Sequence, residues 1–155
     1  MKIKIVKIGE DSKDIFVQSA KEYLQRIHKP FQAEIISAQE NKRLKNSADA
    51  VVKDQEGKTL LQLAAGHYLV AMHETGKLIS SVNFANFLEE KSTNGQKVAF
   101  LIGGPTGLSD EVLKTCHMQL SLSPMTFPHR MALCMLSEQI YRATEILRGG
   151  PYHKA

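Results

Sequence analysis

The chain has 155 residues, of which 43% are hydrophobic and 23% are charged, with a formal net charge of +4 and a pI of about 9.1. These proportions exclude a wholly disordered chain, and the length predicts a single domain covering residues 1–155. No stretch approaches the roughly 20 apolar residues that span a bilayer, so we expect a cytoplasmic protein with no membrane partner, whose basic character suits a polyanion without identifying one.

Strands and helices alternate along the first half of the chain. A β-branched run at 3–8, ended by Gly9, predicts a first strand. Apolar residues at helical spacing predict a helix over about 11–27, which Pro30 stops, and a second strand follows at 33–37.

A polar and basic loop is expected next, at 39–46. Ser47 is the expected N-cap of a helix that runs to about residue 65. A third strand is expected over 68–73, and the sequence Glu-Thr-Gly-Lys at 74–77 predicts a turn that ends it.

The second half repeats the alternation. Ser80 or Ser81 is expected to cap a helix, and the uninterrupted apolar run at 98–102 predicts a strand buried on both faces of a parallel sheet. The remaining expected elements are a helix capped by Ser109, a short strand marked by Leu120 and Leu122, and a last helix over about 129–147. This order implies an α/β domain with a mostly parallel sheet flanked by helices, and a plain doubly wound sheet fits it equally well.

A glycine-rich turn at 103–107 follows the buried strand and precedes a capped helix. Ligands of open parallel sheets bind at such carboxyl ends, where backbone amides are available. The turn is neither a G-x-G-x-x-G motif nor a phosphate-binding loop, because Leu108-Ser109 follows Gly107. A purely structural turn is the alternative.

The loop at 122–129 is stiffened by Pro124 and Pro128. Fixed backbone beside apolar side chains can hold a planar base through main-chain hydrogen bonds. The alternative is that the loop tucks Met125 and Phe127 into the core.

The last helix begins with six consecutive apolar residues at 131–136. A helix that is apolar all round must be buried on several sides, which predicts a homodimer through this helix. The alternative is the central helix of a monomer. On its polar side, Arg142 forms either a surface ion pair or an anion contact.

The tail at 148–154 joins two glycines to a tyrosine and several cations. Such a segment can order over nucleic acid, although termini of this kind are more often frayed.

Cys116 and Cys134 form no C-x-x-C pair and are expected to be buried reduced thiols. The six histidines show no H-x-x-x-H spacing, so we expect no metal site.

Together these segments resemble one family, ribosomal large subunit methyltransferase H. The resemblance covers the whole chain and is densest after residue 98, in the runs at 100–108, 120–129, 138–143 and 151–154. It implies the SPOUT fold with a C-terminal trefoil knot, a homodimer, and S-adenosylmethionine as the cofactor. It further implies methylation of N3 of pseudouridine 1915, in the helix 69 loop of 23S rRNA, within the ribosome.

The resemblance also assigns the site residue by residue. The implied cofactor contacts are Met72, Gly103, Leu122, Ser123, Pro124, Met125, Thr126 and Phe127. The implied catalytic residues are Arg142, Tyr152 and His153, and the implied RNA contacts are His129, Arg130 and Lys154. The tail is expected to close over a site of the partner subunit. The sequence departs from the family at Met72, where Leu is frequent, and at the added Ala155.

Three other functions are compatible with parts of the sequence. They are a SPOUT enzyme acting on tRNA or another rRNA base, a non-catalytic ribosome-binding factor that has kept the fold, and an unrelated nucleotide-binding α/β domain. The last is disfavoured because the chain has no phosphate-loop lysine or ribose-binding acid at the usual spacing.

Overall fold

A computed structural model describes residues 1–10, 12–40 and 46–154. Five strands and five helices alternate along this part of the chain. The strands span Lys2–Ile8 (β1), Gln32–Ala38 (β2), Tyr68–Leu78 (β3), Val98–Ile102 (β4) and Met118–Ser121 (β5). The helices span Ile15–Gln25 (α1), Asp49–Leu63 (α2), Ser81–Thr93 (α3), Asp110–Thr115 (α4) and His129–Leu147 (α5).

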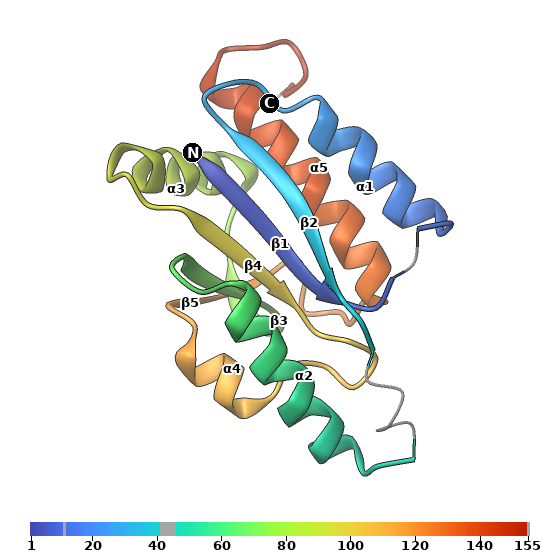
Figure 1. Ribbon diagram of the computed structural model, residues 1–155. Helices are drawn as coiled ribbons and strands as arrows, with labels where there is room; N and C mark the ends of the chain where they lie inside the picture. The colour runs from blue at the N-terminus through green and yellow to red at the C-terminus, as the bar shows by residue number, and fades with distance from the viewer. Residues whose placement is uncertain (11, 41–45, 155) are drawn as a thin grey trace.

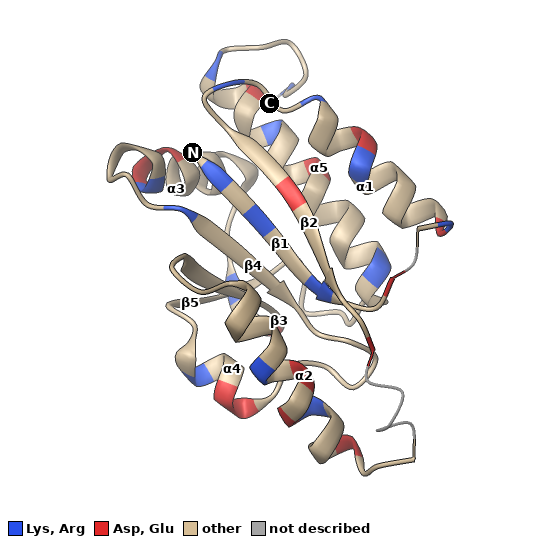
Figure 2. Cartoon of the chain, viewed as in Figure 1, with Lys and Arg blue, Asp and Glu red and all other residues tan. Residues whose placement is uncertain are grey.

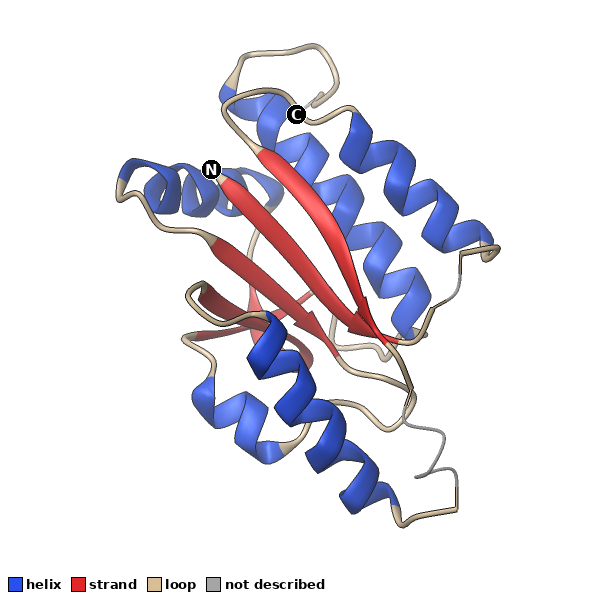
Figure 3. Cartoon of the chain, in the orientation of Figure 1, coloured by secondary structure: helices blue, strands red, loops and turns tan. Residues whose placement is uncertain are grey.

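The five strands form one sheet in the order β2-β1-β4-β3-β5, and every neighbouring pair is parallel. Helices cover both faces of the sheet (Figures 1 and 3). Helix α5 packs against α1 and α3 on one face, and α2 packs against α4 on the other. The predicted α/β class with a parallel sheet is therefore confirmed.

The central strands are buried on both faces. Along β4, Val98, Phe100 and Ile102 face the layer of α1, α3 and α5. Ala99 and Leu101 alternate with them and face the layer of α2 and α4. The sequence of β4 is apolar throughout because neither face reaches water.

Several predicted boundaries are correct. Ser80 caps α3 through its hydroxyl, which accepts from Asn83 N at 3.1 Å, and Ser109 caps α4 in the same way. Helix α5 begins and ends where the sequence predicts, at His129 and Leu147.

Two predicted helix starts are wrong. Helix α1 begins at Ile15, because the carboxylate of Asp14 accepts hydrogen bonds from Phe16 N and Val17 N and so sets the N-cap there. Helix α2 is preceded by Ala48 at the N-cap position, with no side-chain cap, so Ser47 does not play that part. Most of the predicted loop at 39–46 lies outside the described residues.

Strand β3 does not end at residue 73 as predicted. It bulges at the predicted turn and then pairs again with β5, so that Met72 and Lys77 both align with Leu120. Strand β5 in turn ends at Ser121, one residue before Leu122. The knot implied by the family resemblance stays a prediction.

No helix within residues 1–10, 12–40 and 46–154 has both the length and the apolar character needed to cross a membrane.

Candidate functional site

A cavity of about 710 Å³ lies at the carboxyl ends of β4 and β5. The glycine turn after β4 and the proline-flanked segment after β5 both line it, together with the bulge of β3 and the first turn of α5. The two segments singled out in the sequence therefore meet in space. A volume of this size falls within the roughly 300–1,000 Å³ typical of small-molecule sites.

Close backbone packing shapes the glycine turn. A Cβ atom on Gly103 would lie 2.5 Å from the carbonyl carbon of Gly107, so only glycine fits at this position. Gly107 has a φ of +82°, and its amide donates to the carbonyl of Gly104 at 2.9 Å. The turn thus folds back on itself and presents its backbone to the cavity.

The bulge of β3 places polar side chains at the rim. His73 and Glu74 line the cavity, with 3.8 Å between His73 Nε2 and Glu74 Oε2. Gly76 allows the bulge to lie against β5, because a Cβ there would be 2.7 Å from the backbone of Gln119. The Ser121 hydroxyl donates to the Glu74 carbonyl at 3.1 Å and so ties the bulge to the end of β5.

The segment after β5 is held open rather than folded into the core. The side chain of Met125 is 72% exposed, and the Met125 amide donates to Ser123 Oγ at 3.1 Å. Phe127 is half-buried at the cavity wall. The alternative in which Met125 enters the core is therefore wrong.

Two polar atoms beside the glycine turn are buried and have no hydrogen-bond partner within residues 1–10, 12–40 and 46–154. They are Glu56 Oε2, from α2, and Thr106 Oγ1, in the turn itself. Burial raises the pKa of the Glu56 carboxyl, and the nearby charge of Glu40 raises it further. Buried polar groups without a partner are rare in folded proteins, so these atoms favour a ligand that hydrogen-bonds to them.

Most of the residues expected to contact the cofactor line this one cavity. They are Met72, Gly103, Leu122, Ser123, Met125, Thr126 and Phe127, and the expected RNA contact His129 joins them. Pro124 is exposed and stands outside the lining. Their roles as ligand contacts stay predictions.

Arg130, a second expected RNA contact, lies outside the cavity lining and pairs with Asp14 through an Nη1–Oδ2 distance of 3.3 Å. The third, Lys154, is exposed near the end of the chain.

The expected catalytic residues form a separate cluster where the tail folds back on α5. Arg142 donates from Nε to Glu138 Oε1 at 2.9 Å, and Tyr152 Oη donates to the same oxygen at 3.1 Å. Arg142 Nη1 is 3.4 Å from His153 Nδ1, and its guanidinium lies 4.6 Å from the Tyr152 ring centre. Of the two readings of Arg142, the structure shows the ion pair.

Two pKa shifts define the chemistry of this cluster. Burial, followed by the hydrogen bond to Glu138, raises the pKa of Tyr152 to about 12, so its phenol stays protonated at neutral pH. The hydrogen bond to Glu138 raises the pKa of Arg142. The cluster thus presents a fixed cation and a protonated phenol.

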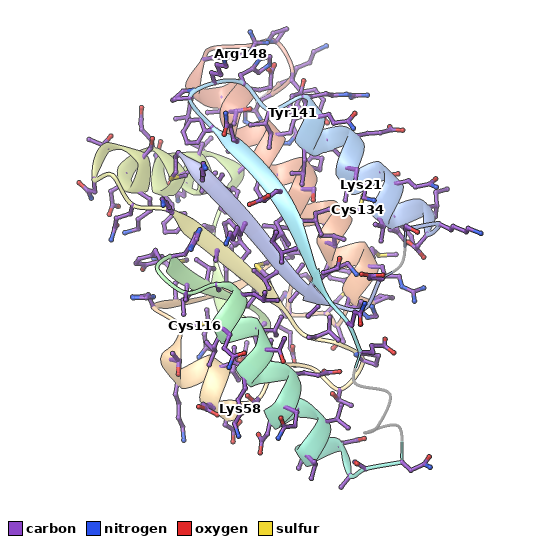
Figure 4. All side chains as sticks on the ribbon, in the orientation of Figure 1. Lys21, Lys58, Cys116, Cys134, Tyr141 and Arg148 are labelled. Carbon is purple, nitrogen blue, oxygen red and sulfur yellow. The ribbon has the colours of Figure 1, made fainter. Side chains whose placement is uncertain are left out.

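Within a single chain, this cluster lies far from the cavity. Arg142 follows His129 by 13 residues on one helix, which corresponds to about 20 Å at 1.5 Å per residue. None of Arg142, Tyr152 and His153 lines the cavity. Figure 4 shows the two halves of α5, with Cys134 in the first half and Tyr141 and Arg148 toward the other end.

A buried carboxylate beside the tail was not anticipated from the sequence. Glu145 is 1% exposed, and its Oε1 lies 2.8 Å from His28 Nε2 and 2.6 Å from Arg148 Nε. The hydrogen bond from Arg148 is the main cause that lowers the pKa of Glu145, and His28 adds to it. The carboxylate thereby links α5 to the segment before β2.

Lys53, His73, Glu74 and Thr106 also line the cavity but were missed from the sequence. They come from α2, the β3 bulge and the glycine turn, and only tertiary packing brings α2 to the turn. Thr106 alone carried a signal, since it stands inside the glycine turn that the sequence marked.

The two cysteines are free and half-buried. Burial raises the pKa of the Cys116 thiol to about 11, which makes it a poor nucleophile at neutral pH. Within the described part of the chain, no three His, Cys, Asp or Glu side chains gather as a metal site would require.

Comparison with known proteins gives a consistent family. The family model described as "Predicted SPOUT methyltransferase" matches residues 1–153. A protein of Parabacteroides distasonis named "Ribosomal RNA large subunit methyltransferase H" is 40% identical, over 99% of both chains. A protein of the same name from Hahella chejuensis is 37% identical, again over 99% of both chains.

Solved structures agree at the level of the fold. A probable methylase family protein from Haemophilus influenzae superposes with a TM-score of 0.58 at 20% identity, covering 99% of this chain and 70% of that one. A probable methyltransferase from Bordetella pertussis gives a TM-score of 0.58 at 15% identity, covering 92% of this chain and 95% of that one.

Proposed function

The chain belongs to the SPOUT methyltransferase family, and we propose from this premise that it methylates large-subunit ribosomal RNA with S-adenosylmethionine. The proposed acceptor is N3 of pseudouridine 1915 in 23S rRNA, and the proposed substrate form is the ribosome. The curated relatives named for large-subunit ribosomal RNA support the substrate class.

The cavity is the observation that carries the proposal. Its wall combines glycine-turn backbone, the half-buried side chains of Leu122 and Phe127, and the hydroxyl of Thr106, which has no hydrogen-bond partner among the described residues. Adenosine needs an apolar slot with main-chain donors and acceptors, and the remainder of the cofactor needs polar partners. The residues present fit both requirements.

When bound, S-adenosylmethionine supplies a methyl group that its sulfonium has already activated. The protein therefore has mainly to orient the acceptor nitrogen, and orientation alone can contribute about 7–11 kcal/mol. In the proposal, Met72, Gly103 and the segment at 122–127 hold the cofactor. His129, at the start of α5, faces the same cavity and is placed to contact the RNA.

The acceptor nitrogen must lose a proton during the reaction. In the proposal His153 assists that loss, while Arg142 or Lys154 offsets negative charge on the base or a phosphate. Tyr152 contributes by donating its phenol hydrogen to Glu138, the carboxylate that holds Arg142.

A homodimer is part of the proposal. Within one chain the tail cluster and the cavity are about 20 Å apart along α5, so a second copy is needed to bring them together. The apolar run at 131–136 supports this arrangement: Leu133 and Leu136 are buried in the core, while Met135 remains 36% exposed. Ile15, at the start of the packed neighbour α1, is 70% exposed.

The compact domain also bears on the form of the substrate. The five-stranded sheet and its covering helices offer little surface for reading a base sequence, so we propose that the protein recognises an assembled ribosome by shape, in the cytoplasm. Methylation of a tRNA or another rRNA base remains the rival activity, and a non-catalytic ribosome-binding factor is the rival of another class.

Methyl transfer from radiolabelled S-adenosylmethionine tests the proposal. The protein is incubated separately with ribosomes lacking the modification, protein-free 23S rRNA and total tRNA, and labelled RNA is mapped by mass spectrometry. We expect label only on a pseudouridine of 23S rRNA, with ribosomes as the best substrate. Label on tRNA would establish the rival activity, and no label together with no cofactor binding would establish the non-catalytic factor.

A further inference from the structure

Helix α2 brings two opposite charges to the glycine turn. Lys53 lines the cavity, and its Nζ lies 4.0 Å from where a Cβ on Gly107 would stand. Glu56 lies one helical turn further on and does not itself line the cavity, but its Oε2 is 3.0 Å from where a Cβ on the lining residue Gly104 would stand. Residues three apart share a helix face, so both side chains reach the turn from the same side.

Neither charge is neutralised by another residue of the described chain. No ion pair joins Lys53 to Glu56 or to any other described side chain, and Glu56 Oε2 is buried without a hydrogen-bond partner. Figure 2 shows that α2 carries both signs of charge along its length. A buried carboxylate oxygen with no donor is costly, so a ligand that supplies a donor there gains affinity.

The cavity wall is divided by polarity. The segment after β5 supplies the apolar side chains Leu122, Met125 and Phe127, whereas the glycine-turn side adds Lys53 and the unpartnered hydroxyl of Thr106. S-adenosylmethionine is divided in the same way, into a flat adenine and a zwitterionic amino-acid end. An ammonium group matches Glu56, and a carboxylate matches Lys53.

We propose that Lys53 and Glu56 of α2, with Thr106 of the glycine turn, bind the zwitterionic amino-acid end of the cofactor. This inference rests on the proposed function, because it takes S-adenosylmethionine as the ligand. A ribose diol would also bond to a carboxylate, but it gives no partner to the lysine. The pairing of both charges therefore favours the amino acid.

Calorimetric titration with two ligands tests the assignment. S-Adenosylhomocysteine carries the amino-acid end, and 5′-methylthioadenosine lacks it while keeping adenine and ribose. The variants are Glu56→Gln and Lys53→Met, and the matched control is Asp54→Asn, which removes an exposed charge from the same helix. Melting temperatures establish that each variant is folded.

We expect each of Glu56→Gln and Lys53→Met to weaken S-adenosylhomocysteine binding by about tenfold or more, because each removes a charge-assisted hydrogen bond. Binding of 5′-methylthioadenosine should stay within about twofold of wild type, and Asp54→Asn should change neither ligand. Equal weakening of both ligands would place Glu56 at the nucleoside and overturn the inference. So would unchanged binding in both variants.

The cofactor assignment and the role of Lys53 and Glu56 can fail separately. If wild-type protein binds neither ligand, the cofactor assignment itself fails. If the wild-type protein binds both ligands, but the variants do not weaken S-adenosylhomocysteine more than 5′-methylthioadenosine, the proposed function stands and the role of Lys53 and Glu56 is wrong. Should Glu56→Gln not fold, Lys53→Met alone decides, since Lys53 is only half-buried.

Discussion

His153 is the residue whose proposed role separates most sharply from cofactor binding. It lies beside Arg142 in the tail cluster, outside the cavity that is proposed to hold the cofactor. We expect His153→Ala to lower the methyl-transfer rate by about 10²-fold or more, the usual contribution of a proton-transferring side chain. Single-turnover kinetics on ribosomes and calorimetry with S-adenosylhomocysteine measure the two quantities.

Cofactor affinity should stay within about twofold in this variant, because truncation at the tail leaves the cavity wall intact. If rate and affinity both remain at wild-type values, the assignment of His153 is wrong.

Glu145 gives a pH dependence of stability whose sign follows from its contacts. Its hydrogen bonds from Arg148 and His28 lower the pKa of the carboxyl, so the ionised form is favoured in the folded state. The stability it contributes is present above the ordinary pKa of Glu and is lost as the pH falls through the lowered value. We therefore expect the wild-type melting temperature to drop in acid more steeply than that of Glu145→Gln.

Near pH 7 the same substitution should lower the melting temperature by several degrees, because about 1–3 kcal/mol is lost with a buried hydrogen-bonded charge. The matched control is Glu22→Gln, on the exposed face of α1. Scanning calorimetry from pH 3 to pH 7 makes the comparison, and parallel curves for wild type and Glu145→Gln would contradict the account.

The individual residues around the cavity were the part of the site hardest to predict from the sequence. Met72, Gly103 and the segment at 122–127 were anticipated because the family resemblance marks them. Glu56 and Lys53 were not, since a Lys and a Glu three apart on a helix predict only a solvated face. Their significance arises where α2 packs on the glycine turn.

At the scale of elements, alanine substitutions at two positions of the glycine turn test how closely the turn is packed. A methyl group on Gly103 would meet backbone at 2.5 Å, whereas one on Gly104 would meet the side-chain oxygen of Glu56 at 3.0 Å. Backbone cannot give way as a side chain can. We expect Gly103→Ala to cost about 1–3 kcal/mol of unfolding free energy and Gly104→Ala clearly less.

Urea denaturation of the two variants measures the difference. Equal losses would mean that the turn relaxes freely, and the account of a rigid cavity wall would then need revision.

Only the first part of strand β3, before its bulge, was predicted from the sequence. The sequence Glu-Thr-Gly-Lys at 74–77 has turn chemistry, and the chain does loop out there. It then returns to pair with β5 at the same Leu120, which no local signal reveals. By contrast β4, α3 and α5 were predicted well, since an unbroken apolar run, a serine cap and a long helical pattern are all local features.

At the scale of the whole molecule, the separation of cavity and tail predicts complementation between subunits. Met72→Arg should project a cation into the cavity and abolish cofactor binding, and His153→Ala should disable the tail. Each variant alone should be inactive or nearly so. In an equal mixture, half of the dimers carry one of each chain and have one intact site, so about a quarter of wild-type activity should return.

Co-expression of the two variants with different purification tags isolates the mixed dimer for assay. A mixed dimer with no activity would show that cavity and tail act within one chain. A protein that sediments as a monomer at assay concentration would equally contradict the composite site.

The parallel sheet and its two helical layers were predictable from alternation and burial patterns. Strand order was not, because the same pattern of elements permits several orders. The family resemblance supplied the fold family, and the structure shows that the two loop segments meet at one cavity.

The central claim is that this cavity is the cofactor site, and titration of the protein with S-adenosylhomocysteine in a calorimeter tests it most directly. The account predicts saturable binding, one molecule per available cavity, that is lost in Met72→Arg while the variant keeps its wild-type fold. Binding that persists undiminished in Met72→Arg, or no heat with the wild-type protein, would contradict it.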